Sequence, residues 1–371
     1  MQRTVPSELG VSLQGHRYFI QASSFTLSSL LRLSEIRPDN IRIPDMGKKI
    51  FVVTGATGNQ GSAIARGLLK TGEWHIRAVT RNATGEKAQK LVAEGMEVVQ
   101  ASYDDEESVR KAFAGAQAIF AVTNWWEPFF KGAGLHGAGD TEERQGITLA
   151  KLAAEVGTLE HYIWSTLPAA KEMTNGKFPV PHFDYKAKVD KYIWEKLPDL
   201  AAKTTFLMFG FYPSNFAFFP MLKPIPVATA PGSYVWMVPA DKKTPYPLSG
   251  DMTKDPGVWA RQILAQPKLS HGKYAAVCTE VLTFEEQLSQ WSEVSGKKGI
   301  YVEVKPEVVG QLYGLAGEEA VTGVLFGTAV SDWFRQAKEQ GIFVTKEELG
   351  IMPDEISTFK QSLEAVKQFL G

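Results

Sequence analysis

The chain has 371 residues with 40 lysines and arginines against 41 aspartates and glutamates, giving a formal net charge of −1. This balance provides no long-range field that would favour nucleic acid or an anionic membrane surface. The single cysteine, Cys278, excludes an internal disulfide and a cysteine-rich metal site and is typical of a reducing compartment. No apolar run reaches the roughly 18 residues of a membrane-spanning helix. We therefore expect a cytoplasmic protein, with the nucleus left open, built as one domain with an appended lobe.

Residues 1–45 differ from the rest in composition. They contain arginine but no lysine, many serines, and the weakly amphipathic stretch FIQASSFTLSSLLRL, which a mitochondrial presequence could also show. Acidic residues are scattered through the same segment, whereas presequences are poor in acids. Met46 directly precedes the first convincing strand. The pattern predicts an irregular or disordered extension, or a start codon placed too far upstream, rather than a targeting peptide.

From Met46 onward, strand and helix patterns alternate. Short apolar runs predict strands within residues 48–54, 74–81, 96–102, 116–123, 159–166 and 204–212. Periodic segments predict helices within residues 59–72, 86–95, 105–115, 139–157 and 183–196. This alternation implies right-handed crossovers and a parallel sheet covered on both faces. Residues 46–212 are therefore predicted to form an α/β domain with a doubly wound parallel Rossmann sheet.

The rhythm breaks after Tyr212. Residues 213–248 are dense in proline and aromatic side chains, too irregular for further βαβ units and too apolar for disorder. They predict a loop-rich region that packs on the C-terminal edge of the sheet. Helical and extended patterns return in residues 255–266, 273–279, 283–296, 300–306 and 354–370. We expect residues 213–371 to form a smaller α/β lobe for a substrate or partner, completed by segments packing on the Rossmann sheet.

Three glycines follow the first strand at a spacing of three. Gly55 allows a tight turn, Gly58 removes a side chain where backbone must approach a pyrophosphate, and Gly61 lets helix and strand lie close. The helix N-terminus then offers free N–H groups to phosphates. A glycine triplet alone could mark any strand-to-helix turn, but the flanking strands and helix also fit a dinucleotide-binding unit.

The end of the second strand bears on the choice of cofactor. An NAD site usually places a carboxylate there for the ribose diol, whereas this chain has Arg81 and no acid. A guanidinium can hold a 2′-phosphate with two hydrogen bonds. The sequence therefore favours NADP(H) over NAD(H), with a solvated surface arginine as the alternative.

Five motifs, in this order and spacing, resemble one family: FVVTGATGNQG, AVTRN, AIFAVTNWWEP, PHFDYKAKVDKYI and FGFYPSNF. The chain resembles the NmrA-like group of atypical short-chain dehydrogenase/reductases over roughly residues 48–345. The resemblance implies a Rossmann domain, a smaller α/β lobe and a cleft between them.

The resemblance also implies which residues meet the cofactor. The pyrophosphate turn would comprise Gly55, Ala56, Thr57, Gly58, Asn59, Gln60 and Gly61, and Arg81 would meet the adenosine phosphate. Adenine would be bordered by Ser102 and Tyr103, although the usual Gly-Asp pair of the family reads Ala101-Ser102 here. The cofactor would be lined further by Thr123, Asn124, Trp125, Lys186, Tyr212, Pro213, Ser214 and Asn215. In this scheme Lys186 reaches the nicotinamide ribose.

Hydride transfer to a carbonyl needs a proton donor near the oxygen. The Tyr-x-x-x-Lys pair of dehydrogenases occurs only at Tyr192 and Lys196, well along the predicted helix, and is interpreted as helix surface. His182 lies four residues before Lys186, so both share a helix face, and an imidazole can carry a proton at neutral pH. His182 could instead cap the helix or bond a backbone carbonyl. Lys186 could act as acid or base, as the aligned lysine does in isoflavone-reductase-like relatives, or only bind ribose.

Two further groups could line a substrate site. Ser165 and Thr166 end the fifth strand, where dehydrogenases keep a carbonyl-polarising hydroxyl, and a simple turn is the alternative. Aromatic residues flank a glycine-rich loop, KGAGLHGAG, and follow the sixth strand: Trp125, Trp126, Phe129, Phe130, Phe211, Tyr212, Phe216, Phe218 and Phe219. They predict either an apolar pocket for a flat molecule or a core between the lobes.

The sequence leaves two functions open. One is an NADPH-dependent reductase of a small aromatic or carbonyl-bearing metabolite, with Lys186 and His182 as catalytic candidates. The other is a catalytically silent NADP-binding redox sensor whose shape is recognised by a protein partner such as a transcription regulator. No metal site, direct nucleic-acid contact or membrane contact is predicted, and the oligomeric state stays open.

Overall fold

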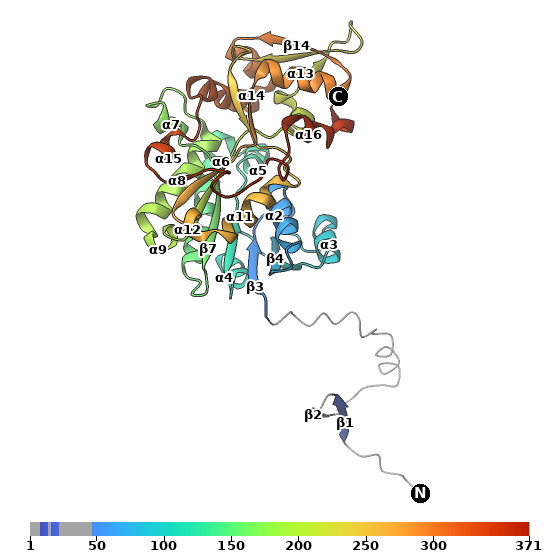
Figure 1. The fold of residues 1–371 in the computed structure, drawn as a ribbon, viewed down its shortest axis with the longest axis vertical. Coiled ribbons are helices and arrows are strands. Elements are labelled where there is room, and N and C mark those ends of the chain that lie inside the picture. The colour runs from blue at the N-terminus through green and yellow to red at the C-terminus, as the bar shows by residue number, and fades with distance from the viewer. Residues whose placement is uncertain (1–7, 14–15, 22–46, 371) are drawn as a thin grey trace. The chain divides into compact units, whose positions relative to one another are not determined.

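The computed structural model describes residues 8–13, 16–21 and 47–370, and the chain divides into two compact units, Met1–Gly47 and Lys48–Gly371 (Figure 1). In the first unit, β1 (Glu8–Leu13) and β2 (His16–Gln21) pair as an antiparallel hairpin. The expectation of irregular chain does not hold for these two strands. The rest of the predicted extension, including most of the presequence-like stretch, lies outside the described residues.

The second unit is organised around an eight-stranded parallel sheet. Its order is β15-β12-β8-β7-β6-β3-β4-β5. The strands are β3 (Lys49–Val53), β4 (Trp74–Thr80), β5 (Glu97–Gln100), β6 (Ala118–Ala121), β7 (His161–Thr166), β8 (Thr204–Phe209), β12 (Lys273–Val277) and β15 (Phe343–Val344). The six predicted strands are confirmed, and the C-terminal region adds two. Strand order reverses between β3 and β6, which is where such sheets bind ligands.

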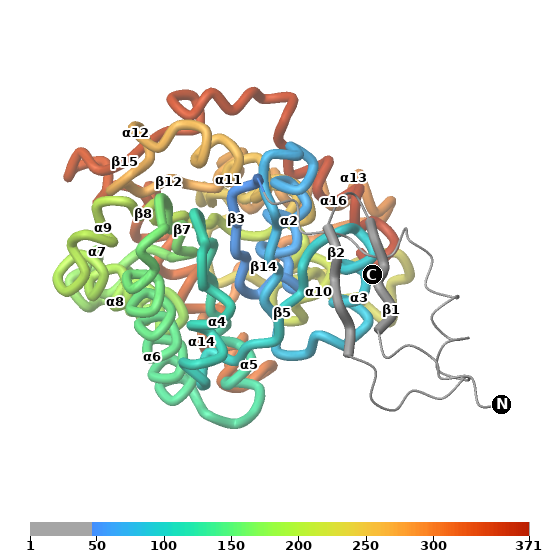
Figure 2. The backbone as a smooth tube through the Cα atoms, turned by 90° about the horizontal axis from the view of Figure 1, so that it is seen from below, coloured from blue at the N-terminus to red at the C-terminus, as the bar shows by residue number. Residues whose placement is uncertain are grey.

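Helices cover both faces of this sheet. The main ones are α2 (Asn59–Leu69), α3 (Glu86–Ala93), α4 (Glu106–Phe113), α6 (Gly134–Ala154), α8 (Pro181–Lys196) and α11 (Asp255–Ala265). Alternate residues of β3 enter different cores: Phe51 faces α2 and α11, whereas Val52 faces α4, α6 and α8. In Figure 2, α11 and the pair α6 and α8 lie on opposite sides of β7 and β8.

The C-terminal lobe has its own small sheets and an aromatic core. Its strands are β9 (Ile225–Pro226), β10 (Ser233–Val238), β11 (Pro245–Leu248), β13 (Glu280–Thr283) and β14 (Lys298–Glu303). They form a three-stranded sheet, β14-β10-β9, and a two-stranded sheet, β11-β13. The loop-rich prediction for residues 213–248 is therefore wrong for β10 and β11. Apolar burial against Trp236, Trp291 and Phe359 outweighs the prolines that obscured these strands.

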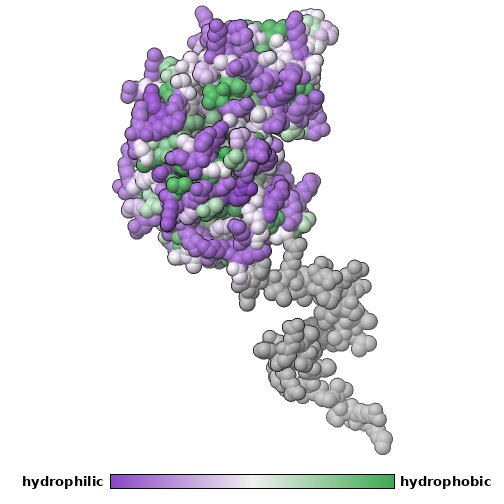
Figure 3. All heavy atoms as spheres, in the orientation of Figure 1, coloured by the Kyte–Doolittle hydropathy of each residue, from purple (hydrophilic) through white to green (hydrophobic). Residues whose placement is uncertain are grey.

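The lobe's longer helices are α13 (Phe284–Ser295), α14 (Pro306–Ala329) and α16 (Phe359–Glu364). Shorter turns are α5 (Trp126–Pro128), η2 (Phe129–Ala133), α7 (Ala170–Met173), α9 (Pro198–Ala201), α10 (Asn215–Phe218), η3 (Pro220–Leu222), α12 (Pro267–Ser270), α15 (Arg335–Glu339) and η4 (Lys367–Phe369). Among the described residues, no helix is long and apolar enough to cross a bilayer. Figure 3 shows a mainly hydrophilic face with small hydrophobic areas.

Two glycine-rich segments are helical although their sequence did not predict a helix, because glycine has a low helix propensity. The predicted loop KGAGLHGAG is wrong: it forms part of the π turn η2 and the first turns of α6, with Gly132 and Gly134 at positive φ where they join. Helix α14, with five glycines, was not predicted. It breaks at Gly314 (φ 59°, ψ −150°), and Gly317 packs so closely on the backbone of Val309 that a Cβ would collide with it.

Candidate functional site

The glycine turn has the form that a dinucleotide cradle needs. Gly55 follows β3 with φ +57°, and the N–H of Gly58 donates to its carbonyl at 2.9 Å. A Cβ on Gly61 would overlap the carbonyl oxygen of Gly55, so α2 lies directly against the turn. Gly58 caps α2 without a side-chain hydrogen bond, which leaves the helix's first N–H groups facing outward for an anion.

The next part of the site joins this turn to the loop after β8. The Nε2 of Gln60 donates to the hydroxyl of Tyr212 at 2.6 Å, while the buried Oε1 of Gln60 has no partner among the described residues. Burial raises the pKa of Tyr212 to about 12, so the phenol stays protonated. Asn215 donates its N–H to the carbonyl of Tyr212, closing the turn that contains Pro213 and Ser214. The predicted loop therefore does reach the glycine turn.

The predicted adenosine end is centred on Arg81. Its guanidinium donates to both carboxylate oxygens of Glu127 at 2.7 Å, and Lys131 contacts the same carboxylate at 2.7 Å. Hydrogen bonds from Arg81 and Lys131 lower the pKa of Glu127 to about 2. Because the Arg81 side chain is 64 % exposed, the pair contributes little stability and its guanidinium can be drawn to a ligand.

Ser102 and Tyr103 follow β5 but face different neighbours. Ser102 closes the start of α4, where its N–H donates to the hydroxyl of Ser108 at 3.1 Å. Tyr103 points to the glycine turn, its hydroxyl bonded to Thr54 and the backbone of Gly55, and burial raises its pKa. The structure therefore brings Tyr103, more than Ser102, to the predicted cofactor position.

At the end of β6, the three predicted residues divide between two roles. Thr123 is buried, and its hydroxyl contacts Lys186 and Glu142. Asn124 is exposed and accepts from the N–H of Trp126 at 3.1 Å, starting α5. Trp125 is buried and stacks on Phe129 with ring centroids 4.9 Å apart. Trp125 thus belongs to a small core rather than an open wall.

Lys186 sits in a buried charge pair that sequence reasoning missed. Its Nζ lies 2.9 Å from Oε1 of Glu142 on α6, 2.8 Å from the hydroxyl of Thr123 and 3.4 Å from the Thr123 carbonyl. The Glu142 side chain has no exposed surface, and its Oε2 has no partner among the described residues. Lys186 also lies 5.3 Å from the centroid of the Trp164 ring. The ammonium is thus a fixed charge at the carboxyl end of β6.

One helical turn after Lys186, Asp190 lies in the core. Its carboxylate accepts from Trp164 and Thr166 at 2.8 Å and from Tyr274 at 3.2 Å. Burial raises its pKa to about 7 despite these hydrogen bonds. The hypothesis that Thr166 polarises a substrate carbonyl loses support, because its hydroxyl already donates to Asp190. Ser165 is fully buried in β7.

His182 is held from the opposite lobe. Oε1 of Glu319 on α14 lies 2.5 Å from Nδ1 of His182 and accepts the backbone N–H of His182 at 2.8 Å. Glu319 has no exposed side-chain surface, while 17 % of the His182 side chain is exposed. His182 therefore does more than cap the helix, because its ring also contacts the carboxylate of Glu319.

The two aromatic groups meet beside His182. The ring centroid of Trp126 lies 4.7 Å from that of Phe219 and 5.3 Å from that of His182. Trp126 also stacks on the exposed Phe130. By contrast, Phe216 packs on Trp236 within the C-terminal core. Of the predicted aromatic residues, Trp126, Phe130 and Phe219 thus form an aromatic wall beside His182, whereas Trp125, Phe129 and Phe216 are buried in core and Phe218 is exposed.

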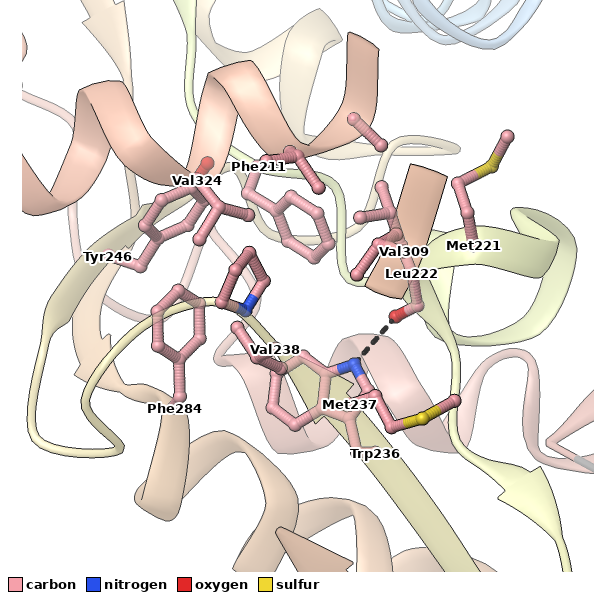
Figure 4. A pocket seen from close by; sticks show the side chains of 13 residues that line it. Phe211, Met221, Leu222, Trp236, Met237, Val238, Tyr246, Phe284, Val309 and Val324 are labelled. Carbon is pink, nitrogen blue, oxygen red and sulfur yellow. Dashed lines mark hydrogen bonds between the residues drawn. The ribbon is translucent and has the colours of Figure 1, made fainter. Parts of the chain in front are cut away.

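Helix α14 lines one side of an apolar cavity in the C-terminal lobe (Figure 4). The hydroxyl of Tyr246 donates to the carbonyl of Gly323 at 3.1 Å. A Cβ on Gly323 would lie 3.9 Å from that hydroxyl and 4.0 Å from Cε1 of His182. The cavity is lined by Phe211, Met221, Leu222, Trp236, Met237, Val238, Pro239, Tyr246, Phe284, Val309, Ala320, Val321 and Val324.

Tyr192 and Lys196 lie at the far end of α8, and Lys196 is exposed. This matches their interpretation as helix surface. The residues that sequence reasoning missed are all carboxylates: Glu127, Glu142, Asp190 and Glu319. Only Asp190 carried a usable signal, because it lies one turn from Lys186 on the same helix.

Comparison with known proteins places these features in a wider context. The NmrA-like family model matches residues 47–339. The NmrA-like family domain-containing oxidoreductase cpsB of Aspergillus campestris is 30% identical over 274 residues, 70% of this chain and 77% of its own length. The similarly named malD of Malbranchea aurantiaca is 30% identical over 292 residues, 76% of this chain and 83% of its own.

Solved structures share the fold. NmrA, a negative transcriptional regulator solved in complex with NADP, aligns with TM-score 0.67 and 24% identity, over 86% of this chain and 96% of its own. The same regulator was also solved with NAD. The NADPH-dependent quinone oxidoreductase QOR2 of Escherichia coli aligns with TM-score 0.59 and 20% identity, over 85% of this chain and 99% of its own.

Proposed function

The chain belongs to the NmrA-like family, and we propose that it is an oxidoreductase that uses NADP(H) to reduce a small aromatic or carbonyl-bearing molecule. The observation that carries this proposal is the pairing of His182 and Lys186 on one face of α8, beside the aromatic wall of Trp126 and Phe219. The family members named as oxidoreductases support the same activity.

The residues present fit a dinucleotide. The glycine cradle leaves no room for side chains where a pyrophosphate would approach, and the unpartnered Oε1 of Gln60 could accept from a hydroxyl or amide N–H of the cofactor. Arg81 would exchange the carboxylate of Glu127 for the 2′-phosphate, which is the better bidentate partner because it carries more charge. That exchange would favour NADP(H) over NAD(H).

When bound, the cofactor would supply a hydride. Lys186 would place a fixed positive charge near the oxygen of the reacting carbonyl and stabilise the negative charge that develops there. Its longest hydrogen bond, 3.4 Å to the Thr123 carbonyl, is the one that a ribose hydroxyl would most easily replace. His182 would hold the proton that the oxygen takes up.

Cofactor binding is tested by calorimetric titration of NADP and NAD against wild-type protein and Arg81→Ala. Loss of one bidentate charged contact should weaken NADP binding about 10- to 100-fold and leave NAD binding unchanged. Equal affinity of the wild-type protein for both cofactors would refute the role of Arg81.

Turnover is tested by following NADPH oxidation with a panel of quinones, aryl aldehydes and aryl ketones. His182→Gln should lower kcat by about 100-fold or more while NADPH still binds. An unchanged kcat in this variant would remove His182 from the reaction.

The second candidate function is a silent NADP(H) sensor read by a protein partner. It is favoured by one observation: His182 and Lys186 both already hold a buried carboxylate, as structural ion pairs do. NADPH binding without oxidation by any member of the panel would favour this function.

A further inference from the structure

We propose that Glu319 is a positioning residue for His182: it fixes the imidazole proton on Nδ1, so that Nε2 exchanges the proton with the substrate. The proposal deepens the proposed oxidoreductase function and rests on it for the chemical step. It means that the C-terminal lobe completes the active site through α14, a helix that the sequence pattern did not reveal.

The geometry assigns the ring nitrogens. An ionised carboxylate can only accept hydrogen bonds. One oxygen of Glu319 accepts the backbone N–H of His182 at 2.8 Å and lies 2.5 Å from the ring Nδ1, so an ionised Glu319 places a proton on Nδ1. Glu319 cannot turn toward solvent, because its side chain has no exposed surface. Among the described residues, none hydrogen-bonds Nε2.

The groups around the ring support this assignment. The rings of Trp125 and Trp126 lie 5.9 and 5.3 Å away, and the backbone of Gly323 borders Cε1. The charged neighbours on α8 itself are Asp184 and Lys186. The carboxylate of Asp184 accepts the N–H groups of Lys171 and Val180 at 2.8 Å. The ammonium of Lys186 is paired with the carboxylate of Glu142 at 2.9 Å. Glu319 is therefore the acid that acts directly on the ring.

In the proposed step, His182 donates a proton while a substrate carbonyl is reduced. With NADPH bound, the carbonyl oxygen would take the proton from Nε2 of the imidazolium as the carbonyl carbon receives a hydride with its two electrons. The ring would become neutral and keep its Nδ1 proton on Glu319, while the products would be an alcohol and NADP⁺. Solvent returns a proton through the exposed part of the ring. The carboxylate thus acts as in other carboxylate–histidine pairs, through orientation rather than proton transfer.

The test measures the tautomer in cofactor-free, full-length protein labelled with nitrogen-15 histidine. The His182 signals are assigned by their loss in His182→Gln. We expect the Nδ1–H form in the wild type and its loss in Glu319→Leu. Glu319→Gln should keep it, because the amide oxygen can replace Oε1. The exposed neighbour on the same helix gives the matched control, Glu318→Gln, which should match the wild type.

A wild-type spectrum dominated by the Nε2–H form, or no change in Glu319→Leu, would overturn the proposal. If Glu319→Leu does not fold, Glu319→Asp replaces it, since the shorter side chain cannot reach both N–H groups. With a substrate in hand, Glu319→Leu should lower kcat about 10-fold or more at unchanged KM. Absence of turnover in the wild type would defeat the oxidoreductase function, whereas the spectrum would still decide the role of Glu319.

Discussion

Two buried carboxylates hold His182 and Lys186 of α8, but they come from different regions. Glu142 stands on α6, in the layer that covers the Rossmann sheet, and it pairs with Lys186 at 2.9 Å. Glu319 stands on α14 of the C-terminal lobe and pairs with His182 at 2.5 Å. Each carboxylate has one unpartnered oxygen among the described residues.

The difference lies in what each pair requires. The ammonium of Lys186 is buried and lies 2.9 Å from Glu142, which supplies its counter-ion. Histidine can be neutral, so His182 needs Glu319 for orientation more than for charge. The Lys186 pair is thus built within one sheet and its helices, whereas the His182 pair depends on both lobes.

The largest effect should come from Glu142→Gln. It leaves the ammonium of Lys186 buried without a counter-charge and should lower the free energy of unfolding by about 3–5 kcal/mol, measured by urea denaturation. The matched control is Glu143→Gln, whose partner Lys188 also lies at 2.9 Å but at the surface, so a loss of at most about 1 kcal/mol is expected.

Glu319→Gln sharpens the same comparison. Because the amide keeps both hydrogen bonds and His182 can be neutral, it should cost only about 1 kcal/mol. Equal losses in the free energy of unfolding for Glu142→Gln and Glu319→Gln would mean that both carboxylates act as counter-ions or that neither does.

Asp190, below Lys186, should make the sheet region sensitive to pH. Its folded pKa of about 7 is raised by burial above the ordinary value of 3.8, so the folded state binds the extra proton. Its stabilising contribution is therefore present below about pH 4 and lost as pH rises through 7. Asp190→Asn should remove a decline on the order of 2–4 kcal/mol between these limits. Unfolding curves at several pH values measure it, and an unchanged slope would contradict it.

A smaller effect is expected at the break in α14. Gly314 has φ 59° and ψ −150°, a conformation that side chains disfavour, so Gly314→Ala should cost about 1–3 kcal/mol. Gly323→Ala, on the same helix with ordinary contacts, should be neutral or stabilising by up to about 1 kcal/mol. Similar effects of both substitutions on the urea midpoint would argue against strain at Gly314.

The smallest effect concerns the adenosine end. Glu127→Gln removes the carboxylate that competes for Arg81 and should raise NADP affinity about 3-fold, in keeping with an exposed ion pair, without changing NAD affinity. Glu94→Gln, which removes a comparable exposed pair with Arg66, should change neither. Weaker NADP binding in Glu127→Gln would show instead that Glu127 presents Arg81 to the cofactor.

Local pattern was enough for much of the molecule. Short-range periodicity and spacing predicted the first six strands of the sheet, the glycine turn and the shared helix face of His182 and Lys186. These patterns depend only on residues close together in the sequence. The same reasoning failed at the start of α6 and at α14, because glycine lowers helix propensity and burial against other elements restored the helix.

Sequence by itself determined the alternation of strands and helices, the glycine turn and the two candidate proton carriers. Only the tertiary structure decided their partners. Glu142 stands beside Glu143, and Glu319 beside Glu318, as identical pairs in the sequence. In each pair one carboxylate is buried against α8 and its neighbour faces outward. Which of the two is buried depends on how each helix is rotated against its neighbours, and long-range packing sets that rotation.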